Sequence, residues 1–234
     1  MSLFLLVRWL YLTGIFLISM LPLRDDATLE GTRDTAGTVG VHLLFTIAYF
    51  VLVDRAVTGF RALRPKFCSI YQPAFWRHER YWKIPAVAYM PIFNGTPFKG
   101  VIWRLLGVRI GRRVFDDGCS IIERSLASVG SYSTLAAGSI IQCHSLEDGA
   151  FKSDYIVFGA GCSIGSAAFV HYGVTMGEGS ALDADSFLMK GENVPPGARW
   201  GGNPASERGW RALPQRAPPV IPAQQRTAIP RKGA

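Results

Sequence analysis

The sequence predicts a mainly β fold, a parallel β-helix built on a hexapeptide repeat, preceded by an α-helical hairpin that spans a membrane. Three observations lead to this prediction. Two long apolar segments open the chain, a basic and aromatic segment follows them, and large apolar residues then recur at every sixth position. With 49% hydrophobic and only 18% charged residues, the chain is not disordered throughout, and its four scattered cysteines do not make a disulfide scaffold.

The two apolar segments have the composition of membrane helices. The first, residues 3–23, contains a single charged side chain, Arg8, and about 20 apolar residues span a bilayer as a helix. The second, residues 38–53, is short, but extension past Asp54 with snorkelling of Arg55 would let it cross. A cleaved signal peptide is the alternative for the first segment, and a buried core helix is the alternative for the second.

The distribution of charge predicts the orientation and the kind of partner. Residues 55–113 hold 12 basic and 1 acidic side chains, whereas residues 114–204 hold 4 and 10. Because positively charged loops stay in the cytoplasm, we expect a multi-pass protein of the plasma or inner membrane whose β-helix is cytosolic. Such segregated charge argues against nucleic acid as a partner, and a basic block beside apolar helices favours membrane lipid.

These shifts in composition divide the chain into four parts. Residues 1–59 are predicted to form the two-helix transmembrane hairpin, and residues 60–106 a basic, aromatic linker at the lipid headgroups, with a solvated linker as the alternative. Residues 107–204 are predicted to form the β-helix, and residues 205–234 a disordered tail rich in Pro and Arg. His78, in the linker, is interpreted as a headgroup contact or a packing residue.

The hexapeptide repeat runs unbroken from residue 158 to residue 205. Its eight first positions are all large and apolar: Phe158, Ile164, Val170, Met176, Leu182, Leu188, Val194 and Trp200. The fifth position is mostly small, and glycine is frequent at the second. A less regular set precedes it: Ile110, Ile122, Val129, Leu135 and Ile141. Neither a helical period nor simple alternation produces this pattern, which is typical of a parallel β-helix with the large residues inside.

The repeat loses its phase between Ile141 and Phe158, where the spacing is one residue short of three hexads. Residues 144–155 are therefore expected to leave the wall of the β-helix as a loop. Loops on rigid scaffolds often carry functional residues. This loop contains His144 and, a few residues later, the acidic pair Glu147 and Asp148.

Four stretches of the sequence carry a family resemblance: FNGTPFKGVIWRLLGVRIGRRVFDDGCSI, IIQCHSLEDGAFKSD, FVHYGVTMGEGS and DSFLMKGENVPPGARWGGNPA. Together they resemble the C-terminal membrane segment and last hexapeptide-repeat module of poly-ε-lysine synthetase-like (Pls/PosA-type) membrane nonribosomal peptide synthetases. The resemblance covers roughly residues 1–204 and implies a left-handed β-helix of the acyltransferase class. The adenylation and carrier domains of those synthetases have no counterpart here, so full polymerase activity does not follow.

The resemblance implies an acyl- or aminoacyltransferase that forms an amide from a thioester and an amine. Hexapeptide acyltransferases commonly use one histidine as the base that takes a proton from the acceptor, and histidine suits this because its pKa lies near neutrality. His144 or His171 would fill this role, and we favour His144 with Glu147 or Asp148 orienting its ring. A loop-anchoring role for His144 and a structural role for His171 are the alternatives.

The acidity of residues 114–204 favours a cationic substrate, such as a chain of diamino acids. Candidate substrate-binding residues are Glu178, Asp183, Asp185 and Tyr172, with ordinary solvated turns as the alternative interpretation of the acidic ones. We expect no metal, because the three-histidine site known on this fold needs more ligands than two histidines provide. We also expect no cofactor bound in this chain, since the acyl donor would be a thioester on a phosphopantetheine carrier or on coenzyme A.

The expected partners follow from the same resemblance. They are membrane lipid, a carrier protein or an adenylation–carrier subunit, and further copies of the chain in a homotrimer, with no nucleic acid. An alternative function is a non-catalytic β-helix that docks the carrier or completes an oligomer.

Overall fold

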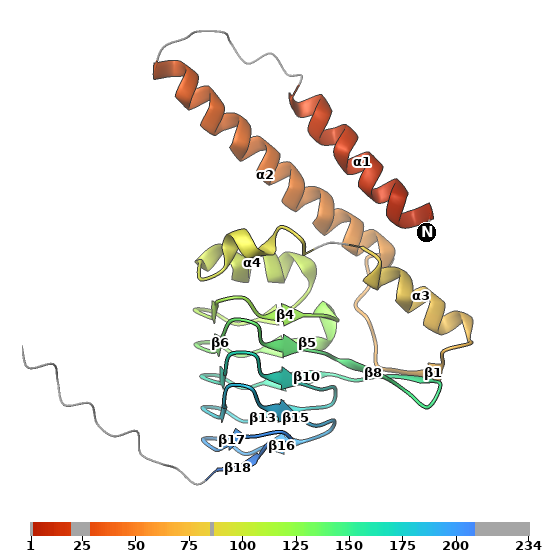
Figure 1. Cartoon of the computed structure of the whole chain (residues 1–234), viewed down its shortest axis with the longest axis vertical. Coiled ribbons are helices and arrows are strands. Elements are labelled where there is room, and N and C mark those ends of the chain that lie inside the picture. The colour runs from red at the N-terminus through yellow and green to blue at the C-terminus, as the bar shows by residue number, and fades with distance from the viewer. Residues whose placement is uncertain (1, 20–28, 85–86, 209–234) are drawn as a thin grey trace, which may run out of the picture.

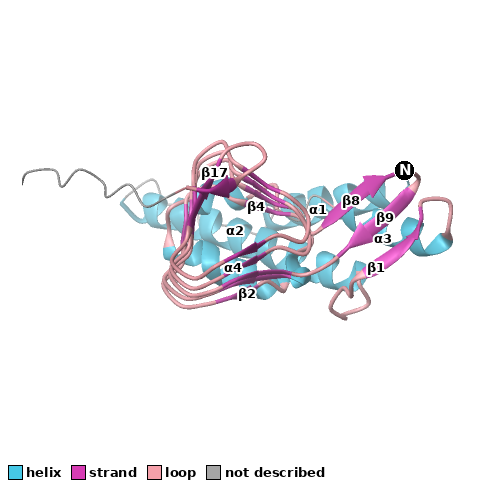
Figure 2. Cartoon of the chain, turned by 90° about the horizontal axis from the view of Figure 1, so that it is seen from below, coloured by secondary structure: helices cyan, strands magenta, loops and turns pink. Residues whose placement is uncertain are grey.

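A prism of short strands occupies the second half of the chain in the computed structural model, which describes residues 2–19, 29–84 and 87–208 (Figure 1). Successive coils of the chain each contribute a strand to three parallel sheets, and these sheets form the three walls of the prism (Figure 2). The prediction of a hexapeptide-repeat β-helix is thereby confirmed, while the left-handed sense of its coil stays a prediction.

The three walls consist of very short strands. The first wall contains β2 (Arg109–Ile110), β5 (Ala127–Val129), β10 (Ile156–Phe158), β13 (Thr175–Met176) and β16 (Asn193–Val194). The second contains β3 (Phe115–Asp116), β6 (Thr134–Leu135), β11 (Ser163–Ile164), β14 (Ala181–Leu182), β17 (Arg199–Gly201) and β18 (Ser206–Glu207), of which only β18 is antiparallel to its neighbour. The third contains β4 (Ser120–Ile121), β7 (Ile140–Ile141), β12 (Phe169–Val170) and β15 (Phe187–Leu188).

The interior of the prism is filled as the repeat predicts. Seven of the eight first positions, from Phe158 to Val194, are 2% exposed or less, and Trp200 in the last coil is half-buried. Burying a large apolar side chain fully stabilises a fold by about 1.5–3 kcal/mol. The fifth positions are small because they fit beside these residues where the chain turns, and Cys162, Ala168, Ser180 and Ser186 are buried there.

Glycine at the second position allows successive coils to approach closely. A Cβ atom on Gly165 would lie 2.3 Å from the backbone nitrogen of Ala184 in the next coil, and one on Gly159 would lie 2.7 Å from that of Glu178. Real Cβ atoms do not approach backbone so closely, so these glycines are required by the spacing between coils.

The break in the repeat forms a hairpin and not an irregular loop. β8 (His144–Glu147) and β9 (Ala150–Ser153) pair antiparallel, and β1 (Lys66–Ser69) adds a third strand beside β9. The hairpin turns at Asp148 and Gly149, both with positive φ. The small sheet extends sideways from the prism, as Figure 2 shows.

Residues 60–106, predicted to be a basic, aromatic linker, form several short elements that pack onto the β-helix, and their contact with lipid headgroups stays a prediction. After β1 they form α3 (Pro73–Trp82), the 3-10 helix η1 (Met90–Phe93) and α4 (Pro97–Leu106). Helix α4 begins with proline and is capped at its C-terminus by Gly107, whose φ of +105° suits a glycine. Its residues Ile102, Trp103 and Leu106 are buried, so α4 caps one end of the prism (Figure 1).

The first coil departs from the regular phase. Ile122, expected inside, is half-buried, and Ile121 takes the inner position instead. The buried carboxylate of Asp116 occupies another inner position and accepts hydrogen bonds from Lys99 Nζ at 2.9 Å and Trp103 Nε1 at 2.7 Å. The cap therefore supplies hydrogen-bond donors to the Asp116 carboxylate, which is buried inside the end of the prism.

Helices α1 (Ser2–Ser19) and α2 (Leu29–Val57) lie antiparallel as a hairpin. Tyr49 Oη donates to the Val7 carbonyl at 2.6 Å, and the Tyr11 hydroxyl lies 3.0 Å from that of Thr46. In the described part of the chain one stretch, Gly37–Val57, is long and apolar enough to cross a membrane, and it is mostly exposed. The apolar part of α1 described here is shorter, and residues 20–23 of the first predicted span lie outside the described residues. A two-span hairpin stays a prediction.

Candidate functional site

A buried carboxylate, Glu123, lies where the first coil leaves the third wall. We call the edge of the prism between the third and first walls the third corner; it comprises residues 122–126, 142–155, 171–174 and 189–192. Glu123 is 0% exposed and precedes the 3-10 helix η2 (Arg124–Leu126). Trp82 Nε1 donates to its Oε1 at 2.8 Å, and the backbone N–H of Cys143 donates to its Oε2 at 3.0 Å.

His144, the predicted base, lies against this carboxylate. Its Nδ1 is 2.7 Å from Oε1 of Glu123. Burial alone would raise the pKa of Glu123, but the close histidines His144 and His78 and the hydrogen bond from Trp82 outweigh burial and lower the pKa to about 2. Glu123 is therefore ionised at neutral pH. An ionised carboxylate 2.7 Å from Nδ1 favours the tautomer with a proton on that nitrogen, in which Nε2 carries the free lone pair.

The ring of His144 is held by aromatic neighbours. Its centroid is 4.5 Å from that of Trp82 and 6.0 Å from that of Phe151, a residue with no exposed surface. The His144 side chain is 12% exposed, so it reaches solvent while its position is fixed. Trp82 thus acts twice, as a stacking surface for the histidine and as a hydrogen-bond donor to the carboxylate.

A second histidine, His78, flanks the same carboxylate. Its Nε2 lies 3.7 Å from Oε1 of Glu123, and its ring packs 4.6 Å from Phe151. The interpretation of His78 as a packing residue holds for the ring, but a headgroup contact does not fit a side chain that is 3% exposed. Phe75, His78 and Trp82 recur at helical spacing on α3, a signal in the sequence that all three face the same neighbour.

His171 lies at the same corner, in the next coil. It is buried, it accepts a hydrogen bond at Nδ1 from the backbone N–H of Tyr172 at 3.1 Å, and its ring contacts Phe169 and Phe187. Burial lowers its pKa, which favours the neutral ring. The third corner thus brings together both histidines that the sequence singles out, but only His144 has a buried carboxylate beside it.

Glu147 and Asp148 do not orient His144, contrary to the expectation from their spacing. They lie at the tip of the hairpin, where Glu147 forms an exposed ion pair with Lys190 and Asp148 is exposed with φ of +52°. Strand β8 is extended, so it carries both residues away from His144. The orienting carboxylate comes instead from Glu123, 21 positions earlier in the chain than His144.

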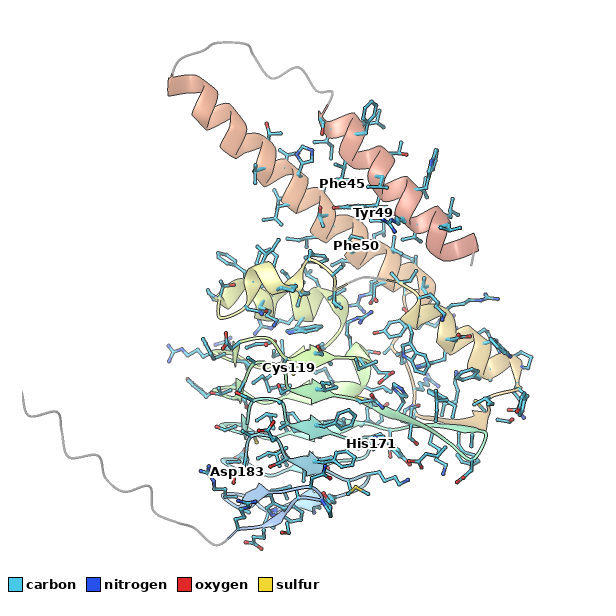
Figure 3. All side chains as sticks on the ribbon, in the orientation of Figure 1. Phe45, Tyr49, Phe50, Cys119, His171 and Asp183 are labelled. Carbon is cyan, nitrogen blue, oxygen red and sulfur yellow. The ribbon has the colours of Figure 1, made fainter. Side chains whose placement is uncertain are left out.

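The four candidate substrate-binding residues are spread over different corners of the prism. Tyr172 stacks edge-on against His171 at 5.1 Å, at the third corner. Glu178 is exposed at the corner between β13 and β14. Asp183 and Asp185 lie between β14 and β15, and Figure 3 shows Asp183 and His171 on opposite sides of the β-helix. Asp183 is also paired with Arg199 at 2.6 Å, which neutralises its charge.

A cavity of about 370 Å³ lies between the cap and the first coil. Its wall includes Trp82, Met90, Trp103, Cys119 and Ile122, so it shares Trp82 with the His144 site. Burial raises the pKa of Cys119 to about 12, which keeps its thiol protonated. Among the described residues no group of three or more His, Cys, Asp or Glu side chains is arranged to hold a metal ion.

Comparison with known proteins identifies a relative. The chain aligns with delta-poly-L-ornithine synthetase of Acinetobacter baumannii at 26% identity over 171 residues, which is 71% of this chain. The chain is homologous to this synthetase. The resemblance to membrane nonribosomal peptide synthetases is thereby confirmed. The aligned part is 12% of the synthetase, so the chain spans only a small fraction of its relative's length. No family model matches the chain.

Solved structures of hexapeptide-repeat enzymes are also similar. A hexapeptide-repeat acetyltransferase of Vibrio cholerae complexed with acetyl coenzyme A shares 22% identity at a TM-score of 0.40, over 43% of this chain and 58% of that one. A maltose O-acetyltransferase of Clostridium difficile shares 17% identity at a TM-score of 0.43, over 63% and 97%. These likenesses are weak, and the β-helix assignment rests on the coils of this chain itself.

Proposed function

We propose that the chain is a membrane-anchored acyl- or aminoacyltransferase module of the nonribosomal peptide synthetase type, in which His144 is the general base. The observation that carries this proposal is the 2.7 Å contact between His144 Nδ1 and Glu123, a fully buried carboxylate whose pKa is lowered to about 2. A buried, ionised carboxylate behind a partly exposed histidine is the arrangement that holds an imidazole ready to accept a proton.

The reaction would join an amine to a thioester carbonyl. The amine nitrogen attacks the carbonyl carbon, Nε2 of His144 takes the proton that the nitrogen loses, and the carbon–sulfur bond breaks as the amide forms. The departing thiolate then receives the proton from Nε2, so the base is restored. Glu123 stabilises the imidazolium that exists between the two proton transfers and acts as a positioning residue.

Direct transfer fits the state of the cysteines. All four are buried, and burial raises the pKa of Cys119 to about 12 and that of Cys143 well above the usual range. A protonated, buried thiol is a poor nucleophile, so the group would pass from donor to acceptor without an intermediate on this chain. The donor thioester would sit on coenzyme A or on the phosphopantetheine of a carrier protein or adenylation–carrier subunit.

The substrate proposal is a cationic amine, such as a chain of diamino acids. The name of the homologous synthetase refers to an ornithine polymer, and residues 114–204 hold 10 acidic and 4 basic side chains. Of the four candidate residues, Tyr172 beside His171 is the best placed for a substrate at the third corner. Glu178 and Asp185 would act through the overall field and not by contact.

The membrane proposal places α2 across the bilayer with the β-helix in the cytosol. Arg55 lies near the end of the apolar stretch Gly37–Val57, Arg61, Arg64 and Lys66 follow it, and positively charged flanks stay in the cytoplasm. Helix α1 lies along α2 and would enter the same membrane, which makes the protein multi-pass in an inner or plasma membrane.

Turnover by the full chain in detergent micelles or nanodiscs tests the transferase proposal. Aminoacyl-coenzyme A and an aminoacyl-loaded carrier are offered in turn with a diamino acid acceptor, and release of free thiol is measured. His144→Ala is expected to lower kcat about 10²–10⁴-fold. Glu123→Gln is expected to lower kcat with little change in KM and to alter the pH profile, while His42→Ala in α2 serves as the control. Full turnover by His144→Ala would refute the mechanism.

A non-catalytic docking or assembly module is the second candidate, because the third wall has an apolar outer face. Phe169 and Phe187 meet edge-on at 5.2 Å on this face, beside a groove of about 320 Å³. Such a face suits a carrier protein or the neighbouring subunits of a homotrimer. A chain that never turns over but binds a carrier, or that sediments as a trimer until Phe169→Asp is introduced, would support this function.

A further inference from the structure

The outer surface of the cap carries an apolar stripe. Ile92 of η1 and Phe98 of α4 are 69% and 63% exposed, and Val101 and Leu105 continue the stripe at helical spacing along α4. The opposite side of α4 packs on the first coil, so the stripe faces away from the β-helix. Three of these exposed apolar side chains lie on one face of α4 and the fourth on the adjoining η1, and such a group marks a binding surface.

This stripe is continuous with the candidate membrane helix. Arg55, in the last turn of α2, donates from Nε to the carbonyl of Leu105 at 3.0 Å, and Phe50 of α2 stacks on Tyr89 next to η1 at 5.9 Å. Figure 1 shows α2 rising from the capped end of the β-helix. A bilayer that receives Gly37–Val57 therefore begins beside the cap.

The charge of the surrounding surface fits the same neighbour. Residues 55–113, which contain the cap and its connections, hold 12 basic side chains and 1 acidic one. Exposed arginines lie before the cap, within it and in the first coil: Arg61, Arg64, Arg104, Arg109, Arg112 and Arg113. Basic side chains near a membrane surface attract anionic lipid headgroups.

We propose that the outer face of the cap, Ile92, Phe98, Val101 and Leu105, lies in the headgroup and upper acyl region of an anionic bilayer. The β-helix then stands with its first coil toward the membrane and its acidic coils away from it, at a height fixed by the cap. This inference rests on the proposed membrane anchorage of α2 and adds a second, interfacial contact to it.

Depth-dependent fluorescence quenching tests the proposal. All four native cysteines are buried, so single cysteines introduced at Phe98→Cys and Val101→Cys can be labelled with an environment-sensitive dye in the full chain. The protein is reconstituted in vesicles of phosphatidylcholine and phosphatidylglycerol that contain doxyl-labelled lipid. Leu44→Cys, on the exposed face of α2, is the positive control, and Met189→Cys, exposed on a corner of the β-helix, is the negative control.

The expected result is quenching at positions 98 and 101 several-fold stronger than at 189, and weaker quenching in vesicles of phosphatidylcholine alone. Quenching at 44 but not at 98 or 101 would overturn the interfacial contact and leave the anchorage standing. Absence of quenching at 44 would overturn the anchorage itself. Equal quenching at 98 and 101 in both kinds of vesicle would overturn the electrostatic part of the proposal.

Discussion

Asp54, near the end of α2, and Arg124, in the first coil, form an ion pair that is buried on both sides. The guanidinium of Arg124 also lies 4.5 Å above the ring of Tyr81. Arg124 directly follows Glu123 in the sequence. The residue that pairs with the candidate membrane helix is therefore next to the residue whose carboxylate contacts His144. The candidate membrane helix and the candidate site are therefore parts of one packed unit.

Asp54→Ala is expected to destabilise the protein by about 3–5 kcal/mol, because it leaves the Arg124 guanidinium buried without its counter-charge. Thermal unfolding in detergent micelles measures the loss. Glu147→Ala is the matched control, since it breaks an exposed ion pair with Lys190 and should hardly change the unfolding temperature. Equal effects of the two substitutions would contradict the buried pair.

Asp116→Asn is expected to destabilise the capped end of the prism by about 3 kcal/mol or more. The Asp116 carboxylate accepts hydrogen bonds from Lys99, Trp103 and two backbone N–H groups. An amide replaces one acceptor with a donor and leaves the buried Lys99 ammonium without a counter-charge, with only its hydrogen bond to Asn94. Chemical denaturation of the single variants and of the pair Asp116→Asn with Lys99→Met measures their coupling. Simple additivity would contradict this account.

The sequence predicts the β-helix well because each coil depends on local periodicity. Positions such as Met176 and Leu182 must face inward whatever the rest of the chain does, and the structure buries both. The loss of phase also marked where His144 leaves the wall. These features follow from spacing along the chain alone.

The environment of His144 was not predictable in the same way, because it depends on contacts between distant segments. Glu123 lies in a coil without regular phase, and it meets His144 only because adjacent coils stack at the third corner. Trp82 and His78 reach the site only because α3 packs against the hairpin and its Phe151. Local spacing therefore predicted that Glu147 or Asp148, the acidic residues nearest to His144 along the chain, would orient its ring.

Gly165→Ala is expected to destabilise the β-helix by more than about 3 kcal/mol, since the added methyl group would press on the backbone of the next coil. Gly197→Ala is the control. Its φ is +69° but no atom lies within 4 Å of the added group, so only a left-handed backbone penalty of about 1–2 kcal/mol is expected. If thermal unfolding ranks the two variants in the opposite order, the close approach of the coils does not limit stability.

Glu123→Gln is expected to destabilise the protein more at neutral pH than in acid. The folded-state pKa of Glu123 is about 2, against 4.5 for an unperturbed glutamate. A carboxyl group whose pKa is lower in the folded state than in the unfolded state stabilises the fold fully at pH values above its unfolded-state pKa. This stabilisation is lost as the pH falls through its folded-state pKa. Between pH 7 and pH 3 the difference in unfolding free energy between wild type and Glu123→Gln should narrow by on the order of 2 kcal/mol.

Thermal unfolding of both proteins in the same detergent at several pH values measures that narrowing. Trp82→Phe is an intermediate case, because it keeps the aromatic stack on His144 but removes one hydrogen-bond donor to Glu123. The folded-state pKa of Glu123 should therefore rise, and the stability that its ionised form contributes should be lost at a higher pH. A difference between wild type and Glu123→Gln that stays constant from pH 7 to pH 3 would mean that Glu123 is not held ionised by its neighbours. In that case His144 would lack the charged partner on which its proposed role as a base depends.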